Sequence, residues 1–222
     1  MIKAVLFDMD GVIFDTEKLG REGWFKAGKE LGFYVDDDRI RQIRGSNVNR
    51  SRQLFKEWYG DTELYTEARA VRDGYQHEQI EKNGIGVKPG YAELRRYMKE
   101  KGIKSALTTS TQRSGAEYDF GQAGLSIDFD ATVCGTEIKH GKPEPDIYIL
   151  AASRLNEKPE DCMVLEDSPN GLKAANGSGC KVIMIPDLDP ATPSLAAMCS
   201  RVCRDMFEVK EYLEQEAGEK TK

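Results

Sequence analysis

The feature that most constrains this chain is an apolar run, residues 2–7, that ends at two closely spaced carboxylates, Asp8 and Asp10. Such a run predicts a buried strand of a parallel sheet. If the strand continues through Asp10, both carboxylates point to one side at its carboxyl end, where open α/β sheets bind ligands. Gly11 would then end the strand and let another group approach the backbone. A surface turn is the alternative, but apolar residues on both sides of the pair disfavour it.

Two carboxylates at this spacing favour both a metal site and acid–base chemistry. Like charges this close repel each other and raise the pKa of one group. Mg²⁺ relieves the repulsion, and it commonly binds one or two carboxylates together with phosphate oxygens. One aspartate can then attack as a nucleophile while its neighbour transfers the proton.

Beyond this strand the pattern of the chain changes twice. Helical periodicity dominates residues 16–86, with helices expected over 18–31 and 36–43, from Asn47 or Asn49 to Gly60, and from Asp61 to about 83. Strands and helices alternate from residue 87 onward, which predicts a doubly wound parallel sheet of the α/β class. We therefore expect a core domain of residues 1–15 and 87–222 and a helical domain of residues 16–86. Hinges near 14–18 and 82–88 would let the two close and exclude water.

Hydroxyls at the end of the strand predicted over residues 103–108 are candidate phosphate ligands. Phosphoryl transfer needs donors around the equatorial oxygens, and Thr109 with the backbone N–H of Ser110 can supply them. Because Thr108, Thr109 and Ser110 are adjacent, the pattern does not decide which hydroxyl binds phosphate. Capping of the following helix is the alternative role.

A lysine and a second acidic pair complete the set. Lys142 is followed by two prolines, which make a rigid approach to a helix and hold the ammonium where it can offset charge on Asp8 and on a phosphoryl group. Glu166 and Asp167 follow another apolar run and can complete a magnesium shell, directly or through water. Alternatively, Asp167 or Ser168 simply caps the helix that Pro169 begins, and both roles can hold at once.

Four stretches, in this order, resemble the motifs of the haloacid dehalogenase-like (HAD) hydrolases, which are aspartate-nucleophile phosphatases and their relatives. The stretches are Val5–Thr16, Ser105–Ser110, Gly141–Asp146 and Val164–Gly171. The resemblance implies a Rossmann-like core with a helical, C1-type cap at residues 16–86. Within the family, the chain resembles the branch that includes β-phosphoglucomutase and many phosphatases of small metabolites.

The resemblance also implies roles for individual residues. Asp8 would take the phosphoryl group, Asp10 would act as general acid and base, and Thr109 and Lys142 would hold the phosphoryl oxygens. Mg²⁺ is the implied cofactor. Its expected ligands are Asp8, Asp10 through its backbone carbonyl, Asp167 and, in support, Glu166.

Contacts to the rest of the substrate are expected from three residues. Arg44 lies in the polar loop 44–50 between two predicted helices, and Ser110 and Arg113 follow the hydroxyl-rich strand. A solvated turn for Arg44 and a solvated helix face for Arg113 remain open alternatives. The expected activity is hydrolysis of a small phosphorylated metabolite, such as a sugar phosphate, through an aspartyl-phosphate.

Two other functions are considered. A phosphomutase of the β-phosphoglucomutase type has a histidine soon after the first motif, but the corresponding position here is Gly20. A non-enzymatic phospho-acceptor, like a response-regulator receiver, shares the residue types but has them in another order and has no helical insert. Dehalogenation is disfavoured because the dehalogenases of this fold lack the second aspartate, here Asp10.

Composition limits the partners and the location. The net charge is −6 with dispersed basic residues, which argues against nucleic-acid binding. No stretch approaches the roughly 20 apolar residues that span a bilayer, and no signal-peptide pattern precedes the first strand. Five cysteines without a CxxC pair indicate reduced thiols in a cytoplasmic protein. A monomer or weak homodimer is expected.

Overall fold

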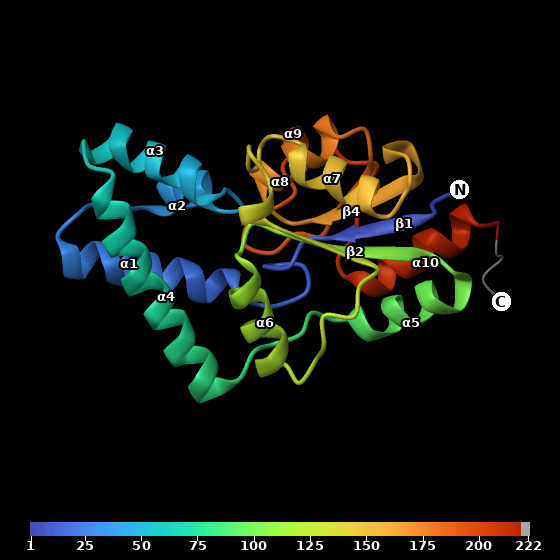
Figure 1. The fold of residues 1–222 in the computed structure, drawn as a ribbon, viewed down its shortest axis with the longest axis horizontal. Helices are drawn as coiled ribbons and strands as arrows, with labels where there is room; N and C mark the ends of the chain where they lie inside the picture. Colours follow the sequence, from blue (N-terminus) through green and yellow to red (C-terminus); the bar gives the residue numbers. More distant parts are fainter. Residues whose placement is uncertain (219–222) are drawn as a thin grey trace.

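A six-stranded parallel sheet forms the centre of the computed structural model, which describes residues 1–218 (Figure 1). The strand order is β3-β2-β1-β4-β5-β6, so the first strand of the chain lies in the interior of the sheet. The strands are β1 (Ala4–Phe7), β2 (Lys104–Thr109), β3 (Ala131–Cys134), β4 (Cys162–Glu166), β5 (Lys181–Met184) and β6 (Arg201–Val202). The doubly wound α/β prediction is confirmed.

Helices cover both faces of the sheet. Side chains of β1 alternate between the faces, with Val5 and Phe7 on one side and Ala4 and Leu6 on the other. The first face packs against α5 (Tyr91–Lys101), α6 (Arg113–Gln122) and α10 (Met206–Glu216). The second packs against α7 (Asp146–Arg154) and α8 (Pro169–Gly177). Burial of both faces explains why the strand segments are almost continuously apolar.

Residues 16–86 form a group of four helices beyond the carboxyl ends of the strands (Figure 1). We call this segment the helical insert. Its aromatic cluster, centred on Trp24, Phe55 and Tyr65, is separate from the two clusters that cover the sheet. The helices are α1 (Glu17–Leu31), α2 (Asp37–Ile43), α3 (Val48–Tyr59) and α4 (Glu63–Asn83).

Caps at the insert's helix ends follow the sequence closely. Asn47, rather than Asn49, caps α3, because its side-chain oxygen accepts a 3.0 Å hydrogen bond from the N–H of Arg50. Asp36 caps α2 in the same way, and Gly32 ends α1 in a left-handed conformation.

The chain enters and leaves the insert at one place. The N–H of Asp15 donates to the carbonyl of Gly86 at 2.9 Å, and the N–H of Lys88 donates to the carbonyl of Ile13 at 2.8 Å. These two connections lie where the hinges are expected. The domain boundaries themselves stay a prediction, and residues 219–222 of the core segment lie outside the described residues.

Three details differ from the sequence prediction. Strand β1 ends at Phe7 and does not continue through Asp10, because the chain turns at Gly11, whose φ is +81°. The two-residue strand β6 and the one-turn helix α9 (Pro193–Ala196) are too short to give a periodic signal.

No helix within residues 1–218 is long and apolar enough to cross a membrane. All five cysteines are free thiols.

Candidate active site

Three buried carboxylates meet where β1 and β4 end. One oxygen each of Asp8, Glu166 and Asp167 lies within 4.8 Å of the others. The two strands pair in parallel with Phe7 opposite Leu165, so the acids that follow them reach the same edge of the sheet. Burial of three like charges this close is unfavourable unless cations or hydrogen-bond donors compensate them.

Lys142 supplies one compensating charge. Its ammonium donates 2.6 Å hydrogen bonds to Asp8 Oδ1 and to Glu166 Oε1, and its side chain is fully buried. Burial opposes the charge on Lys142, but the two carboxylates outweigh it and raise the pKa of this lysine. For Asp8, burial dominates and raises the pKa despite the attraction of Lys142. Asp8 Oδ2 has no hydrogen-bond partner within residues 1–218 and remains available.

Glu166 uses both of its oxygens to fix its surroundings. Oε1 also accepts a 2.6 Å hydrogen bond from the Tyr148 hydroxyl. Oε2 accepts from the N–H groups of Asp167 and Ser168 at 3.0 and 3.1 Å. Although burial favours its neutral form, Lys142 and these hydrogen bonds lower the pKa of Glu166. This geometry suits a residue that holds Lys142 and the β4–α8 turn in place.

Asp167 is the carboxylate that lacks compensation. Its side chain is fully buried, and neither oxygen has a hydrogen-bond partner within the described residues. Burial, followed by the nearby acids Glu17, Glu166 and Asp8, raises the pKa of Asp167. Gly11 permits this approach, since a Cβ there would lie 2.4 Å from Asp167 Oδ2. An unpartnered carboxylate beside Asp8 is the donor set that a hard divalent cation requires, so the residues fit a metal ion.

Asp10 lies in the same cavity as Asp8 but outside the cluster of three acids. Because β1 stops early, its carboxylate points to the hydroxyls of Thr16 and Thr111, which donate to it at 2.6 and 3.1 Å. The expected shared strand face is therefore wrong, although both aspartates still reach one site. The two hydroxyls fix the orientation of Asp10.

The three adjacent hydroxyls have different partners. Thr108 donates to the carbonyl of Phe7 at 2.8 Å, which leaves it inside the sheet. Ser110 donates to the carbonyl of Gly45 in the insert at 2.6 Å. Thr109 accepts from the N–H of Thr111 at 3.0 Å, and its own proton has no acceptor within the described residues. Of these three hydroxyls, that of Thr109 therefore still has a proton available for a hydrogen bond.

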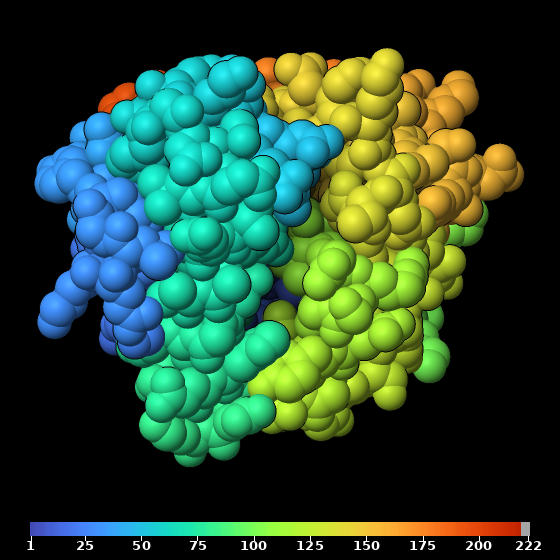
Figure 2. All heavy atoms as spheres, turned by 60° about the vertical axis from the view of Figure 1, so that its left-hand side comes forward, coloured from blue at the N-terminus to red at the C-terminus, as the bar shows by residue number. Residues whose placement is uncertain are grey.

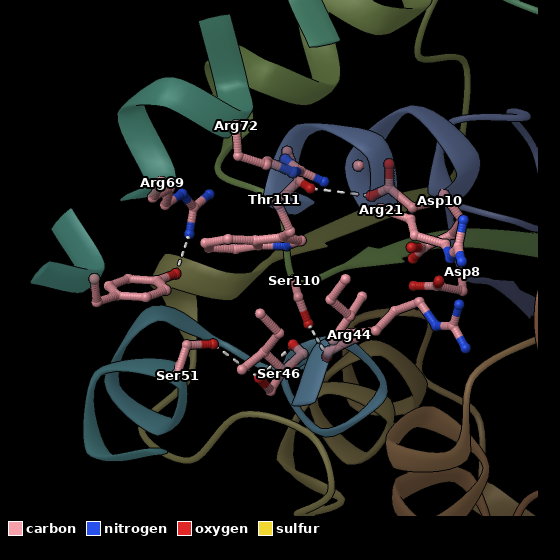
Figure 3. Close-up of a pocket in the computed structure, with 17 residues that line it drawn as sticks. Asp8, Asp10, Arg21, Arg44, Ser46, Ser51, Arg69, Arg72, Ser110 and Thr111 are labelled. Carbon is pink, nitrogen blue, oxygen red and sulfur yellow. Dashed lines mark hydrogen bonds between the residues drawn. The ribbon is translucent and has the colours of Figure 1, made fainter. Parts of the chain in front are cut away.

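Figure 3 shows the cavity between the insert and the core, which encloses about 90 Å³. Asp8 and Asp10 lie at its core end, while Arg21, Arg44 and Arg72 enter from the insert. The complete lining also includes Glu17, Gly20, Trp24, Ile40, Ile43, Gly45, Ser46, Ser51, Tyr65, Arg69, Ser110 and Thr111.

The two arginines predicted to contact substrate differ in their position relative to the cavity. Arg44 is buried, lines the cavity and pairs with Asp189 of the core. Arg113 is half exposed, lies outside this lining and is 3.4 Å from Glu137. The structure therefore does not bring Arg113 to the cavity.

Several contacts hold the insert closed over the core. The side-chain amide of Asn170 donates to the carbonyls of Gln42 and Arg44 at 3.0 and 2.8 Å. Arg41 and Arg44 both pair with Asp189, which is buried. Together with the Ser110 hydrogen bond, these contacts fasten the end of α2 and the α2–α3 loop to the segments that follow β2, β4 and β5.

Sequence reasoning missed Glu17, Arg69, Arg72 and Thr111. Arg69 and Arg72 are three residues apart on α4 and therefore share a helix face, which is a usable signal. Burial raises the pKa of Glu17 to about 7, because its effect outweighs the opposing attraction of Arg44. Nothing in the sequence pattern shows that this carboxyl faces the core.

Comparison with known proteins places these observations in a family. The family model described as haloacid dehalogenase-like hydrolase matches residues 2–179. A phosphorylated carbohydrates phosphatase from Thermotoga maritima is 34% identical over 191 residues, which cover 82% of this chain and 84% of that protein. The β-phosphoglucomutase of Bacillus subtilis is 30% identical over 185 residues, covering 80% of each chain.

A solved structure agrees with the fold. The crystal structure of CbbY from Rhodobacter sphaeroides in complex with phosphate superposes with a TM-score of 0.79 at 28% identity. The superposition covers 94% of this chain and 96% of that one.

Proposed function

The chain belongs to the haloacid dehalogenase-like hydrolases, on their phosphatase and β-phosphoglucomutase branch, and from that premise we propose that it is a Mg²⁺-dependent phosphatase of a small phosphorylated metabolite. One observation carries the proposal. Lys142 holds one oxygen of Asp8, and the other has no hydrogen-bond partner among residues 1–218, in a cavity that also contains the oriented carboxyl of Asp10.

In the first step, Asp8 Oδ2 attacks phosphorus in line, and the bond from phosphorus to the ester oxygen breaks. Protonated Asp10 gives its proton to the leaving oxygen, which departs as an alcohol. Lys142 and the spare proton of Thr109 stabilise charge on the phosphoryl oxygens. The product of this step is an aspartyl-phosphate on Asp8.

In the second step, a water molecule attacks the phosphorus of the aspartyl-phosphate. The Asp10 carboxylate takes the proton from this water, and the bond from Asp8 to phosphorus breaks to release inorganic phosphate. Thr16 and Thr111 keep Asp10 aimed at the same place in both steps. The closed insert limits the access of other water, which protects the intermediate.

A magnesium ion would be held by Asp8, by Asp167 and by the backbone carbonyl of Asp10. When bound, it would offset the negative charge between these acids and the incoming phosphoryl group. The uncompensated oxygens of Asp167 support this assignment. Glu166 would act through Lys142, because its own oxygens are already engaged.

The test is phosphate release from a panel of sugar, nucleotide and two- to three-carbon phosphates. We expect turnover with Mg²⁺, none with chelator, and none for Asp8→Asn. Asp38→Asn is the matched control, because its side chain is 79% exposed on α2. No release from any compound by folded, Mg²⁺-binding protein would overturn the proposal.

A phosphomutase is the second candidate, favoured by the similarity to β-phosphoglucomutase. The position of the expected histidine is Gly20, which faces Arg72. His77 does line a neighbouring cavity together with Asp10, although it comes from α4. Transfer of phosphate between positions of a sugar, abolished in His77→Gln, would favour the mutase.

Other expectations stay predictions. These are a cytoplasmic location, a monomeric or weakly dimeric state, the absence of nucleic-acid partners, residues 16–86 as a helical cap domain, and substrate contacts by Arg44, Ser110 and Arg113.

A further inference from the structure

The catalytic cavity is too small to hold a whole metabolite. It encloses about 90 Å³, whereas small-molecule sites usually measure roughly 300–1,000 Å³. A second cavity of about 330 Å³ lies between α4 and α6 and shares Asp10, Arg69, Arg72 and Thr111 with the first. Figure 2 shows the surface hollowed between these two helices. The non-reacting part of a substrate therefore has room on the α4–α6 side.

Positive charge collects where the two cavities meet. Arg72 Nη1 is 2.8 Å and Arg69 Nε is 3.2 Å from the carboxylate of Asp73. Burial opposes the charge on Asp73, but these two arginines outweigh it and lower its pKa, so Asp73 is ionised. Within the described residues, Asp73 is the one carboxylate that forms an ion pair with either guanidinium group, and the two groups share it.

Arg72 also has an unused donor. Its Nε is buried and has no acceptor within residues 1–218. A buried donor without an acceptor is unfavourable, more so when it is charged, so an acceptor supplied by a ligand would be strongly favoured. Gln76 Oε1 and the Tyr118 hydroxyl line the same cavity and are likewise unpartnered. These groups suit the hydroxyls of a polar substrate.

Opposing charge in the second cavity comes from Asp10 and Asp119. Burial, assisted by the charge of Asp10, raises the pKa of Asp119 to about 7. Its negative charge is therefore suppressed below neutral pH. Thr16 and Thr111 satisfy Asp10 with hydrogen bonds. Within the described residues, neither Asp10 nor Asp119 forms an ion pair with Arg69 or Arg72, so the two guanidinium groups depend on Asp73 alone.

Gly20 keeps the space that Arg72 occupies. A Cβ at this position would lie 2.6 Å from Arg72 Nη2. Any larger side chain at residue 20 would therefore push the guanidinium away from the junction of the two cavities. The position of the Arg72 guanidinium group therefore depends on the absence of a side chain at Gly20.

We propose that Arg72, with Arg69, binds a second anionic group of the substrate, so that the preferred substrates are phosphate esters that also carry a carboxylate or a second phosphate. This inference rests on the proposed phosphatase function. It assigns the scissile phosphoryl group to the cavity of Asp8 and the second anion to the α4–α6 side.

Matched substrate pairs test the proposal. The carboxylate arm compares 3-phosphoglycerate with glycerol 3-phosphate, and the phosphate arm compares fructose 1,6-bisphosphate with fructose 1-phosphate. We expect kcat/KM at least 10-fold higher for the doubly anionic member of one pair. Arg72→Gln should abolish that preference mainly by lowering kcat/KM for this member. Arg50→Gln is the matched control, because Arg50 is exposed on α3.

Binding separates failure of this inference from failure of the proposed function. Calorimetry of Asp8→Asn protein with the same four compounds reports selectivity without turnover. Equal affinity within both pairs, or an equal loss for both members in Asp8→Asn/Arg72→Gln, would overturn the second-anion site even if phosphate release is observed. Selective binding that Arg72→Gln removes would support it even if no compound is hydrolysed.

Discussion

Lys142 donates a 2.6 Å hydrogen bond to Glu166, and neither side chain is exposed to solvent. Breaking a buried ion pair by removing one charge usually costs 3–5 kcal/mol, because the remaining charge stays buried. Glu166→Gln should therefore lower the free energy of unfolding by roughly that amount. Urea denaturation measures the change. Glu160→Gln is the control, since Glu160 is 69% exposed, and equal stability of the two variants would contradict the anchoring role of Glu166.

The raised pKa of Asp119 predicts that the stability of the folded protein depends on pH. Its carboxyl ionises near 3.8 in the unfolded chain, but burial raises the pKa to about 7 in the folded protein. The folded state therefore loses stability as the pH rises from about 4 to 7. Asp119→Asn removes this loss, so the variant should exceed the parent by roughly 4 kcal/mol at pH 8, with the difference vanishing below pH 4.

Thermal or urea unfolding across this pH range measures the Asp119 effect. Glu117→Gln, an exposed substitution on the same helix, should leave the pH profile of the parent unchanged. Parallel profiles for Asp119→Asn and the parent would rule out a raised pKa.

Asn170 predicts how firmly the insert is closed. Its two hydrogen bonds, to the carbonyls of Gln42 in α2 and Arg44 in the α2–α3 loop, contribute about 1 kcal/mol each. Asn170→Ala should therefore shift closure towards the open state by roughly 30-fold. Amide hydrogen exchange of residues 41–47 should speed up accordingly. The exposed Asn49→Ala should behave as the parent. Unchanged exchange in Asn170→Ala would mean that other contacts dominate closure.

Gly11 predicts a specific effect on metal binding. Its φ is +81°, and a Cβ would meet Asp167 Oδ2 at 2.4 Å. Gly60 has a φ of +75° with nothing within 4 Å of a Cβ, so Gly60→Ala reproduces the backbone strain without the clash. Calorimetry should show at least a 10-fold loss of Mg²⁺ affinity for Gly11→Ala and none for Gly60→Ala. Equal affinities would argue against Asp167 as a ligand.

The sheet and the core side of the site were predictable because their signals are local. An apolar run that ends in polar residues marks both a buried strand and its ligand-binding end, and β1, β2 and β4 each follow this pattern. Strand order then brings Asp8, Thr109 and Asp167 to one edge. At the site, the predicted end of β1 was wrong, because a turn at Gly11 replaces the final strand residues.

The insert side of the site was much less predictable. Helix periodicity indicates which residues of α2 and α4 turn inward, but it does not reveal which core residue they meet. Arg44 finds Asp189 in a distant segment, and Arg72 is placed by the absence of a side chain at Gly20. Such pairs depend on how two packed groups of helices are oriented, which no local pattern encodes.

The interior position of β1 has a consequence for the order of folding. The helices of the insert contact one another within residues 16–86, chiefly α1 with α4, so the insert can fold once its last helix has been synthesised, whereas contacts between more distant segments form later. Lys142 lies 134 residues after Asp8 in the sequence, so the two side chains can pair only after that length of chain has been synthesised. A nascent chain of about 100 residues would thus hold a folded insert beside an unpaired β1 and an inert Asp8. The acid gains its surroundings only when β4 docks, so an incompletely folded chain has no site with which to attack cellular phosphate esters.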